Sequence, residues 1–244
     1  DIERMKGTAS VEFWDLGDYK NRRISADDVV EWPRTICVAW NWYGYNKINF
    51  ASEWGDGRED MLQQVWDAFD EADVLVGHNI VGFDIKRLNT EWRDIGLRPP
   101  SPYKTVDTLQ EARKYFGDES RTLDALCKRL GIDAKTDKYD VEVARAALAG
   151  DRKAQITIQS YNEGDIVASI GLFNEFRGWA PTRPHLGELD SERLVCNQCG
   201  SEDMSTNGTY LARQIRYIAY RCDHCGANLK GKQHSRTGGI SGAS

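Results

Sequence analysis

No apolar stretch of the 244-residue sequence approaches the ~20 residues that a membrane-spanning helix requires. We also find no charged segment followed by an apolar one, the pattern of a secretory leader, and no internal repeat. The net charge of −6 argues against a protein that coats nucleic acid nonspecifically. With 40% hydrophobic residues there is enough apolar surface for a core. We therefore expect a soluble, cytoplasmic protein that does not bind membranes.

Positive charge is scarce in most of the sequence and is concentrated near its end. Residues 194–244 carry three acidic residues, and six basic ones at positions 213, 216, 221, 230, 232 and 236. This leaves 26 of the 32 Lys and Arg residues, but 35 of the 38 Asp and Glu residues, for residues 1–193. Such a distribution suits an enzyme that gathers carboxylates around metal ions and docks a polyanion elsewhere.

Strand-forming runs alternate with helical patterns through the first 177 residues. The patterns predict strands at 36–43, 48–51 and 74–77. Helices are expected at 61–69, 84–96, 107–116, 122–130, 140–149 and 154–176. Thr122 is a candidate N-cap, and Gly131 and Gly150 stand where C-terminal glycines belong. The succession predicts an α/β fold in which a mixed central sheet is flanked by helices.

The remaining residues divide into three segments. Residues 178–193 contain two prolines and two glycines and are interpreted as a linker. A small cysteine-bearing module is expected at 194–229. Residues 230–244 form a basic, Gly- and Ser-rich tail that we expect to be flexible. Two further cysteines, Cys37 and Cys127, lie in apolar surroundings and are expected in the core.

Carboxylates suited to metal-dependent phosphodiester cleavage occur in three short segments, because two-metal chemistry needs several carboxylates that converge from different elements. Asp1 and Glu3 are two residues apart, which places both on one face of a strand. Asp84 follows the predicted strand 74–77, at the start of the next helix. Tyr161 and Asp165 share one helical face at i and i+4. Taken singly, an Asp at a helix start is more often a cap than a ligand, and a tyrosine–aspartate pair four residues apart is ordinarily the solvated edge of an amphipathic helix.

The order of these segments is more specific than any one of them. Asp-x-Glu, then Gly77-His-Asn-Ile-Val-Gly-Phe-Asp84, then Tyr161-Asn-Glu-Gly-Asp165 resembles the three motifs of the DEDD proofreading-exonuclease superfamily. The resemblance covers residues 1–176 and is closest to the exonuclease domain of family B DNA polymerases. It implies a ribonuclease H-like fold and 3′→5′ exonuclease activity. The superfamily's histidine branch carries a histidine where this sequence has Ser160, and the four histidines (78, 185, 224 and 234) do not fit that spacing.

By this resemblance, two Mg²⁺ or Mn²⁺ ions would be held by Asp1, Glu3, Asp84 and Asp165, and Tyr161 would orient the attacking water. Asn79 would hydrogen-bond the terminal nucleotide or, alternatively, brace the turn before Asp84. We expect His78 to be structural and Asp107 to cap the following helix rather than to act beside the metals. In the family the first motif ends a core strand, so we expect the natural chain to extend upstream of its aspartate.

The other four cysteines form two Cys-x-x-Cys knuckles, each followed directly by a glycine, at Cys196/Cys199 and Cys222/Cys225. Four thiolates suit one structural Zn²⁺, and strand-forming residues lie between the knuckles. The pattern predicts a zinc ribbon. Thiol redox chemistry is the alternative, but two matched pairs that are each followed by glycine fit one metal better.

Arginines and tyrosines between the knuckles suit phosphate contacts and base stacking. We name Arg213, Arg216 and Tyr217 as candidate substrate contacts, although alternate strand residues face opposite ways. Docking of a replication or repair protein is the other role considered for the ribbon. The main hypothesis is a stand-alone exonuclease on single-stranded DNA. RNA trimming by the same chemistry and non-catalytic nucleic-acid binding on a nuclease scaffold remain alternatives.

Overall fold

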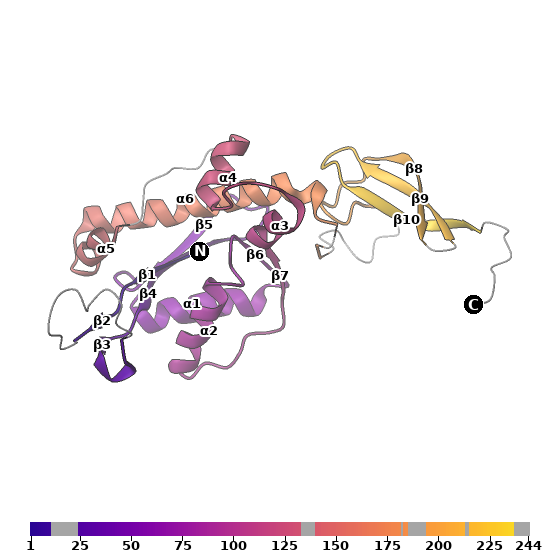
Figure 1. Ribbon diagram of the computed structural model, residues 1–244. Helices are drawn as coiled ribbons and strands as arrows, with labels where there is room; N and C mark the ends of the chain where they lie inside the picture. The colour runs from indigo at the N-terminus through magenta and orange to yellow at the C-terminus, as the bar shows by residue number, and fades with distance from the viewer. Residues whose placement is uncertain (11–23, 133–139, 182, 185–193, 213–214, 237–244) are drawn as a thin grey trace.

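The computed structural model describes residues 1–10, 24–132, 140–181, 183–184, 194–212 and 215–236 (Figure 1). Its strands are β1 (Ile2–Met5), β2 (Thr8–Ala9), β3 (Val29–Glu31), β4 (Arg34–Asn41), β5 (Ile48–Ser52), β6 (Val74–Gly77), β7 (Lys104–Asp107), β8 (Met204–Ala212), β9 (Ile215–Cys222) and β10 (Asn228–Arg236). Its α-helices are α1 (Arg58–Glu71), α2 (Asp84–Asp94), α3 (Thr108–Tyr115), α4 (Leu123–Leu130), α5 (Val141–Leu148) and α6 (Arg152–Phe176). Two 3-10 turns are η2 (Ala26–Asp28) and η3 (Arg177–Trp179).

The first 177 residues contain both antiparallel and parallel strand pairs, as a mixed sheet would, but the pairs belong to separate sheets. β4 lies between β1 and β5, and both neighbours are antiparallel to it. β6 and β7 pair in parallel, and β2 pairs with β3. A cavity of about 540 Å³ is walled by residues of β4, β6 and α6, with Asp1 and Asp84 in its lining. Strand β7 was not predicted, because its four residues carry no pattern apart from their pairing with β6.

Helices cover both faces of the β1–β4–β5 sheet (Figure 1). On one side, Val38 and Ala51 pack with Met61 and Leu62 of α1 and with Trp92 of α2. On the other, a second cluster joins the sheet to α5 and α6, and comprises Met5, Ile36, Cys37, Ala144, Ala147, Ala154 and Ile158. Cys37 and Cys127 are both buried, as the sequence predicted. The predicted α/β class is therefore confirmed.

Helix ends follow local chemistry. Thr122 accepts a hydrogen bond from the Ala125 amide and is the N-cap of α4, as predicted. Gly131 ends the same helix with φ +69°, and Gly150 after α5 has φ +96°. Asp107 caps α3 by accepting from the amides of Leu109 and Gln110. The ends of α3, α4 and α5 are thus set by residues close to them in sequence.

The cysteine-bearing module is a three-stranded antiparallel sheet in the order β10–β9–β8, beyond the C-terminal end of α6 (Figure 1). Strand β10 runs to Arg236, past the predicted module boundary at 229 and into the predicted tail. The predicted linker begins in η3, where a Cβ on Gly178 would lie 2.5 Å from the Cys225 carbonyl oxygen. Residues 182, 185–193 and 237–244 of the predicted linker and tail lie outside the described residues.

Candidate active site and zinc centre

The first motif lies on β1, next to the central strand β4. The Asp1 amino group donates to the Ala39 carbonyl at 2.9 Å, and the Ala39 amide donates to the Asp1 carbonyl at 3.0 Å. Ile2 pairs with Val38, and its side chain is buried in the core. Since successive side chains alternate, Asp1 and Glu3 share the opposite face of the strand. Glu3 is buried, whereas Asp1 is exposed.

Asp165 of α6 meets this pair. Carboxylate oxygens of Asp1, Glu3 and Asp165 all lie within 4.8 Å of one another. Asn162, one turn before Asp165, donates from Nδ2 to Asp1 Oδ2 at 2.6 Å. It is completely buried, so the structure fixes the Asp1 carboxylate from α6. The third motif includes Asn162, but the sequence pattern predicts no role for it, because its partner lies 161 residues away.

Asp84, at the start of α2, also contacts strand β1. It is the first residue of α2, and Phe83 is the N-cap and makes no side-chain capping bond. The Asp84 carboxylate instead accepts a hydrogen bond from the Ile2 amide at 3.2 Å, between Asp1 and Glu3. Asp84 is buried but lies outside the three-carboxylate group. Its hydrogen bond to β1 distinguishes it from an ordinary cap at a helix start.

Crowding and burial make these carboxyls hard to ionise. Burial raises the pKa of Glu3 to about 8, and the negative charges of Asp165 and Asp84 act in the same direction. Burial also raises the pKa of Asp84 and of Asp165. A cluster of carboxyls that repel one another in a buried place is the environment that a divalent cation would relieve.

Tyr161 is hydrogen-bonded to Asp165, the pairing that their i and i+4 spacing predicted. Burial, followed by the charges of Asp165 and Glu3, raises the pKa of Tyr161 above its usual value. The phenol therefore keeps its proton at neutral pH and acts as a hydrogen-bond donor beside the carboxylates. Asp124 of α4 is a further carboxylate of this region that sequence reasoning missed, and its charge also raises the pKa of Asp165.

The other residues of the second motif brace the loop before α2. Asn79 has a left-handed φ of +63°, and its amide donates to Asp107 Oδ1 at 3.0 Å. Asp107 also accepts from the Val81 amide, so it ties the loop to α3 while capping that helix. The two ring nitrogens of His78 lie 2.9 Å from Thr108 Oγ1 and from the Arg121 carbonyl. The backbone of Asn79 thus has a bracing role, and contact of its side chain with a nucleotide stays a prediction.

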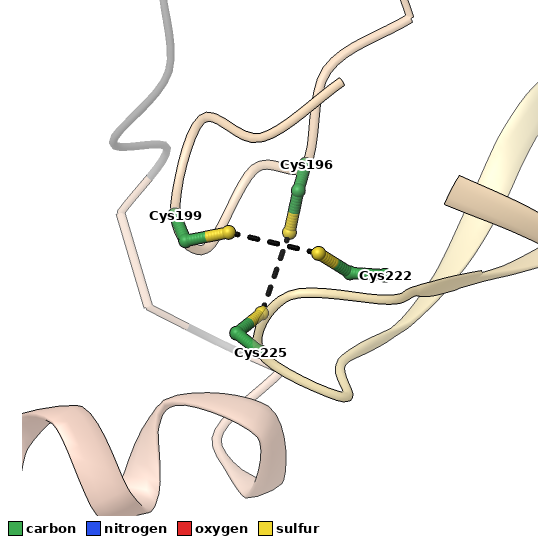
Figure 2. A group of neighbouring side chains, drawn as sticks. All are labelled: Cys196, Cys199, Cys222 and Cys225. Carbon is green, nitrogen blue, oxygen red and sulfur yellow. Dashed lines mark hydrogen bonds between the residues drawn. The ribbon is translucent and has the colours of Figure 1, made fainter. Parts of the chain in front are cut away.

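The four paired cysteines converge on one point (Figure 2). The Cys196 and Cys225 sulfurs are 3.7 Å apart, and those of Cys199 and Cys222 are 3.6 Å apart. All four sulfurs lie within 4.8 Å of one another. Tetrahedral ligands at a Zn–S distance of about 2.3 Å are separated by about 3.8 Å. The geometry therefore fits one Zn²⁺ with four thiolate ligands.

The two knuckles have the same backbone design. The Gly200 amide donates to the Cys196 carbonyl, and the Gly226 amide donates to the Cys222 carbonyl. These glycines have φ values of +77° and +74°, which only glycine adopts without strain. Although burial acts to raise the pKa of Cys222, hydrogen bonds from the Cys225 and His224 amides and from neighbouring thiols lower it. Backbone donors aimed at a sulfur are suited to a thiolate.

The predicted substrate contacts of the ribbon do not share one surface. Tyr217 lies opposite Tyr210, whereas its neighbour Arg216 lies opposite Leu211. Side chains that follow one another along a strand point to opposite faces, so Arg216 and Tyr217 face opposite sides of the sheet. Arg213 lies outside the described residues.

Comparisons with known proteins give one family and several relatives that match this chain over short segments. The model of the RNase H superfamily matches residues 33–177, more than half of the chain. NEN3 of Arabidopsis thaliana is 41% identical over 44 residues, which are 18% of this chain and 9% of NEN3. DNA polymerase III subunit epsilon of Pasteurella multocida is 36% identical over 76 residues, 30% of this chain and 29% of that subunit.

The same subunit of Haemophilus influenzae is 35% identical over 77 residues, 31% of this chain and 29% of the subunit. The matches thus span less than a third of each relative's length. No solved structure matches the chain significantly. Within the residues that the structure describes, none of the helices combines the length and apolar character needed to cross a membrane.

Proposed function

The chain belongs to the RNase H superfamily, and on that premise we propose that it is a metal-dependent 3′→5′ exonuclease acting on single-stranded DNA. The observation that carries the proposal is the meeting of Asp1, Glu3 and Asp165 within 4.8 Å of one another. These side chains come from opposite ends of residues 1–177, a segment that we call the family domain and of which residues 33–177 match the family model. Because like charges repel, bringing such a group together costs stability, and a cation-binding role explains why the fold does so.

The residues fit a site for two Mg²⁺ or Mn²⁺ ions. Asp1, Glu3, Asp84 and Asp165 supply only carboxylate oxygens, the ligands that these hard cations prefer. The pKa of about 8 at Glu3 supports the fit, because a nearby cation would restore its charge. Ions bound there would supply hydroxide from water and stabilise charge on the scissile phosphate and the leaving oxygen.

The chain's own residues would orient the reaction. Tyr161 keeps its proton and is held by Asp165, so its hydroxyl can position the attacking water. Asn162 holds the Asp1 carboxylate from the buried side of α6. Asn79, just after strand β6, is proposed to hydrogen-bond the terminal nucleotide through its side-chain amide. The left-handed turn at Asn79 would set the direction of that side chain.

The comparisons favour DNA over RNA as the substrate. Two relatives are named as subunits of a DNA polymerase, which supports single-stranded DNA and a setting in replication or repair. We propose that the zinc ribbon contributes to substrate binding, with docking of a replication or repair protein as its alternative role. A cytoplasmic location is proposed with these functions.

The test is cleavage of matched single-stranded DNA and RNA, each labelled at the 5′ end, with added Mg²⁺ or Mn²⁺. A ladder of products that shorten from the 3′ end of DNA is expected, and a blocked 3′ end should stop it. Faster trimming of RNA would instead assign an exoribonuclease. An abrupt internal cut would contradict exonuclease action, and nucleic-acid binding without cleavage at any metal concentration would leave a non-catalytic scaffold.

A further inference from the structure

Cross-strand register divides the ribbon sheet into two chemically different faces. Tyr210 of β8 lies directly opposite Tyr217 of β9, and Lys230 of β10 lies opposite Ala219. Directly opposed residues share a face, as do residues two apart on one strand. Tyr210, Tyr217, Lys230 and Arg221 therefore share one side of the sheet. We call these four residues the tyrosine–lysine face.

Within this face, the Lys230 side chain lies close to two tyrosine rings. The Lys230 ammonium lies 4.4 Å from the centre of the Tyr217 ring and 5.9 Å from that of Tyr210. Both distances are within the range of cation–π attraction. Tyr217 is half-buried, whereas Tyr210 is 52% exposed. Tyr217 thus anchors the lysine, and Tyr210 keeps a ring available to solvent.

The opposite face is occupied by structural contacts. The Arg216 guanidinium donates to Thr209 Oγ1 at 3.1 Å. Tyr220 covers Gly231, where an added Cβ would lie 2.6 Å from the tyrosine ring. Such an aromatic ring over a strand glycine covers exposed backbone and fixes register. Tyr220 and Arg216 therefore serve the sheet itself.

Charge is of one sign along all three strands. β8, β9 and β10 contain no Asp or Glu, and the acidic residues of the ribbon are Glu202, Asp203 and Asp223, outside the strands. Asp223 immediately follows Cys222 at the knuckle end of β9, where it accepts a hydrogen bond from Ser205. A long positive sheet with exposed aromatic rings is complementary to a chain of phosphates and bases.

We propose that the tyrosine–lysine face binds single-stranded nucleic acid and that the Arg216 face does not. In this arrangement a base stacks on Tyr210, Lys230 contacts a phosphate, and Arg221 contacts a second one further along the strand. The inference rests on the proposed function, because it takes the ribbon to hold the strand that the carboxylate site trims. It names Lys230 and Arg221, and no longer Arg216, as the residues that contact phosphates.

Two arginines of one strand provide a matched test. Arg216 and Arg221 are both exposed and both lie on β9, but they face opposite sides. Binding of fluorescent oligodeoxythymidine is measured by anisotropy across a salt series, with no Mg²⁺ or Mn²⁺ added so that the strand stays intact. Arg221→Gln should weaken binding and reduce the salt slope by about 0.7, as loss of one phosphate contact to a single strand predicts. Arg216→Gln removes the same charge and should leave both quantities almost unchanged.

Tyr210→Ala tests stacking independently of charge. It should weaken binding roughly tenfold, the loss of about 1.4 kcal/mol expected for one stacked base. Tyr220→Phe, on the opposite face, keeps the ring that covers Gly231 and should bind as the wild type does. Zinc content is measured in every variant, and one ion per chain shows that the ribbon is folded.

Three outcomes would overturn the inference. Equal weakening in Arg216→Gln and Arg221→Gln would mean attraction by overall charge, and a larger loss in Arg216→Gln would assign the opposite face. Unchanged binding in Arg221→Gln and Tyr210→Ala would leave the ribbon to protein partners. Trimming of a short oligonucleotide is measured in parallel, because a wild type that binds through this face but never trims would overturn the proposed function alone.

Discussion

The proposed metal sites of the family domain and of the ribbon are assembled in opposite ways. In the first, Asn162 reaches Asp1 across 161 residues, and carboxylates from β1 and α6 meet only when the whole domain has packed. In the second, Cys196 and Cys225 are 29 residues apart, and each knuckle is shaped by a tight turn. The carboxylate site therefore forms only after the family domain has folded, whereas the cysteine site is expected to stabilise the fold of the ribbon.

Packing shows the same contrast. The family domain buries large apolar side chains such as Trp92, Phe173 and Leu88. The buried cluster of the ribbon consists of Cys196, Cys222 and Ala227, with Met204 and Leu229 among the partly buried residues around it. Sulfur atoms thus form much of the ribbon's core, and we expect the proposed Zn²⁺ to contribute much of its folding free energy. The two units should respond separately to mutation.

The largest expected effect is loss of a carboxylate that serves chemistry rather than packing. Asp84→Ala should abolish cleavage, because it removes a proposed ligand and the group that accepts from the Ile2 amide. Without added metal the variant should stay folded, since burial already penalises the Asp84 charge. Rates are compared with those of Asp94→Ala, an exposed site on the same helix. Rates of Asp84→Ala close to those of Asp94→Ala would remove Asp84 from the mechanism.

The next largest effect is on the folding of the ribbon alone. Cys199→Ser should release the zinc and unfold the module locally, while the family domain trims short oligonucleotides at the wild-type rate. Metal analysis and circular dichroism measure the loss. His224→Ala is the control, because His224 lies exposed within one knuckle of a site that already has four thiolates. Absence of zinc from the wild-type protein would refute the zinc ribbon. If Cys199→Ser loses trimming together with its zinc, the two units are not independent.

The sequence predicted those features that depend on near neighbours. Strand 74–77 matches β6, and Thr122 and Gly131 cap α4 because capping needs only residues within one turn. The cysteine spacing predicted a four-sulfur cluster for the same reason. The glycines after the knuckles have the positive φ values that tight turns require.

Features that depend on distant partners escaped prediction. Lys104–Asp107 is a strand only because it pairs with β6, and Asn162 is a site residue only because Asp1 lies beside it. Strand β10 continues through Gly231 because Tyr220 of β9 covers that glycine, whereas composition alone suggested a flexible tail. For Asp84, capping and metal binding were both open; its carboxylate accepts from the Ile2 amide of β1, and metal binding stays a prediction.

A smaller effect separates positioning from metal binding in the carboxylate site. Tyr161→Phe keeps the ring on α6 and removes only the hydroxyl that bonds Asp165. We expect a loss of about 10²-fold in kcat, the size of a positioning contribution, with unchanged Mn²⁺ affinity. Activity lost as completely as in Asp84→Ala would show that the hydroxyl does more than orient water. Unchanged activity would remove Tyr161 from the mechanism.

The smallest effect is on stability, and its pH dependence identifies its cause. The pKa of Glu3 rises from 4.5 to about 8 on folding, so the folded state binds more protons between these values. Without added Mg²⁺ or Mn²⁺, the contribution of Glu3 to stability is therefore fully present below pH 4.5 and falls as the pH rises towards 8. Glu3→Gln cannot ionise and should escape this loss. At pH 8 its family domain should melt roughly 5 °C above the wild type, with little difference near pH 4.5.

Added Mn²⁺ then distinguishes the cluster from simple burial. In the wild type the cation should raise the melting temperature at pH 8, because it offsets the repulsion among Glu3, Asp165 and Asp84. Glu3→Gln should gain much less, since one carboxylate is missing. The ribbon transition, followed through its zinc, should not move in either protein. A difference between the two proteins that is the same at every pH would show that packing around residue 3, and not its charge, limits the stability of the family domain.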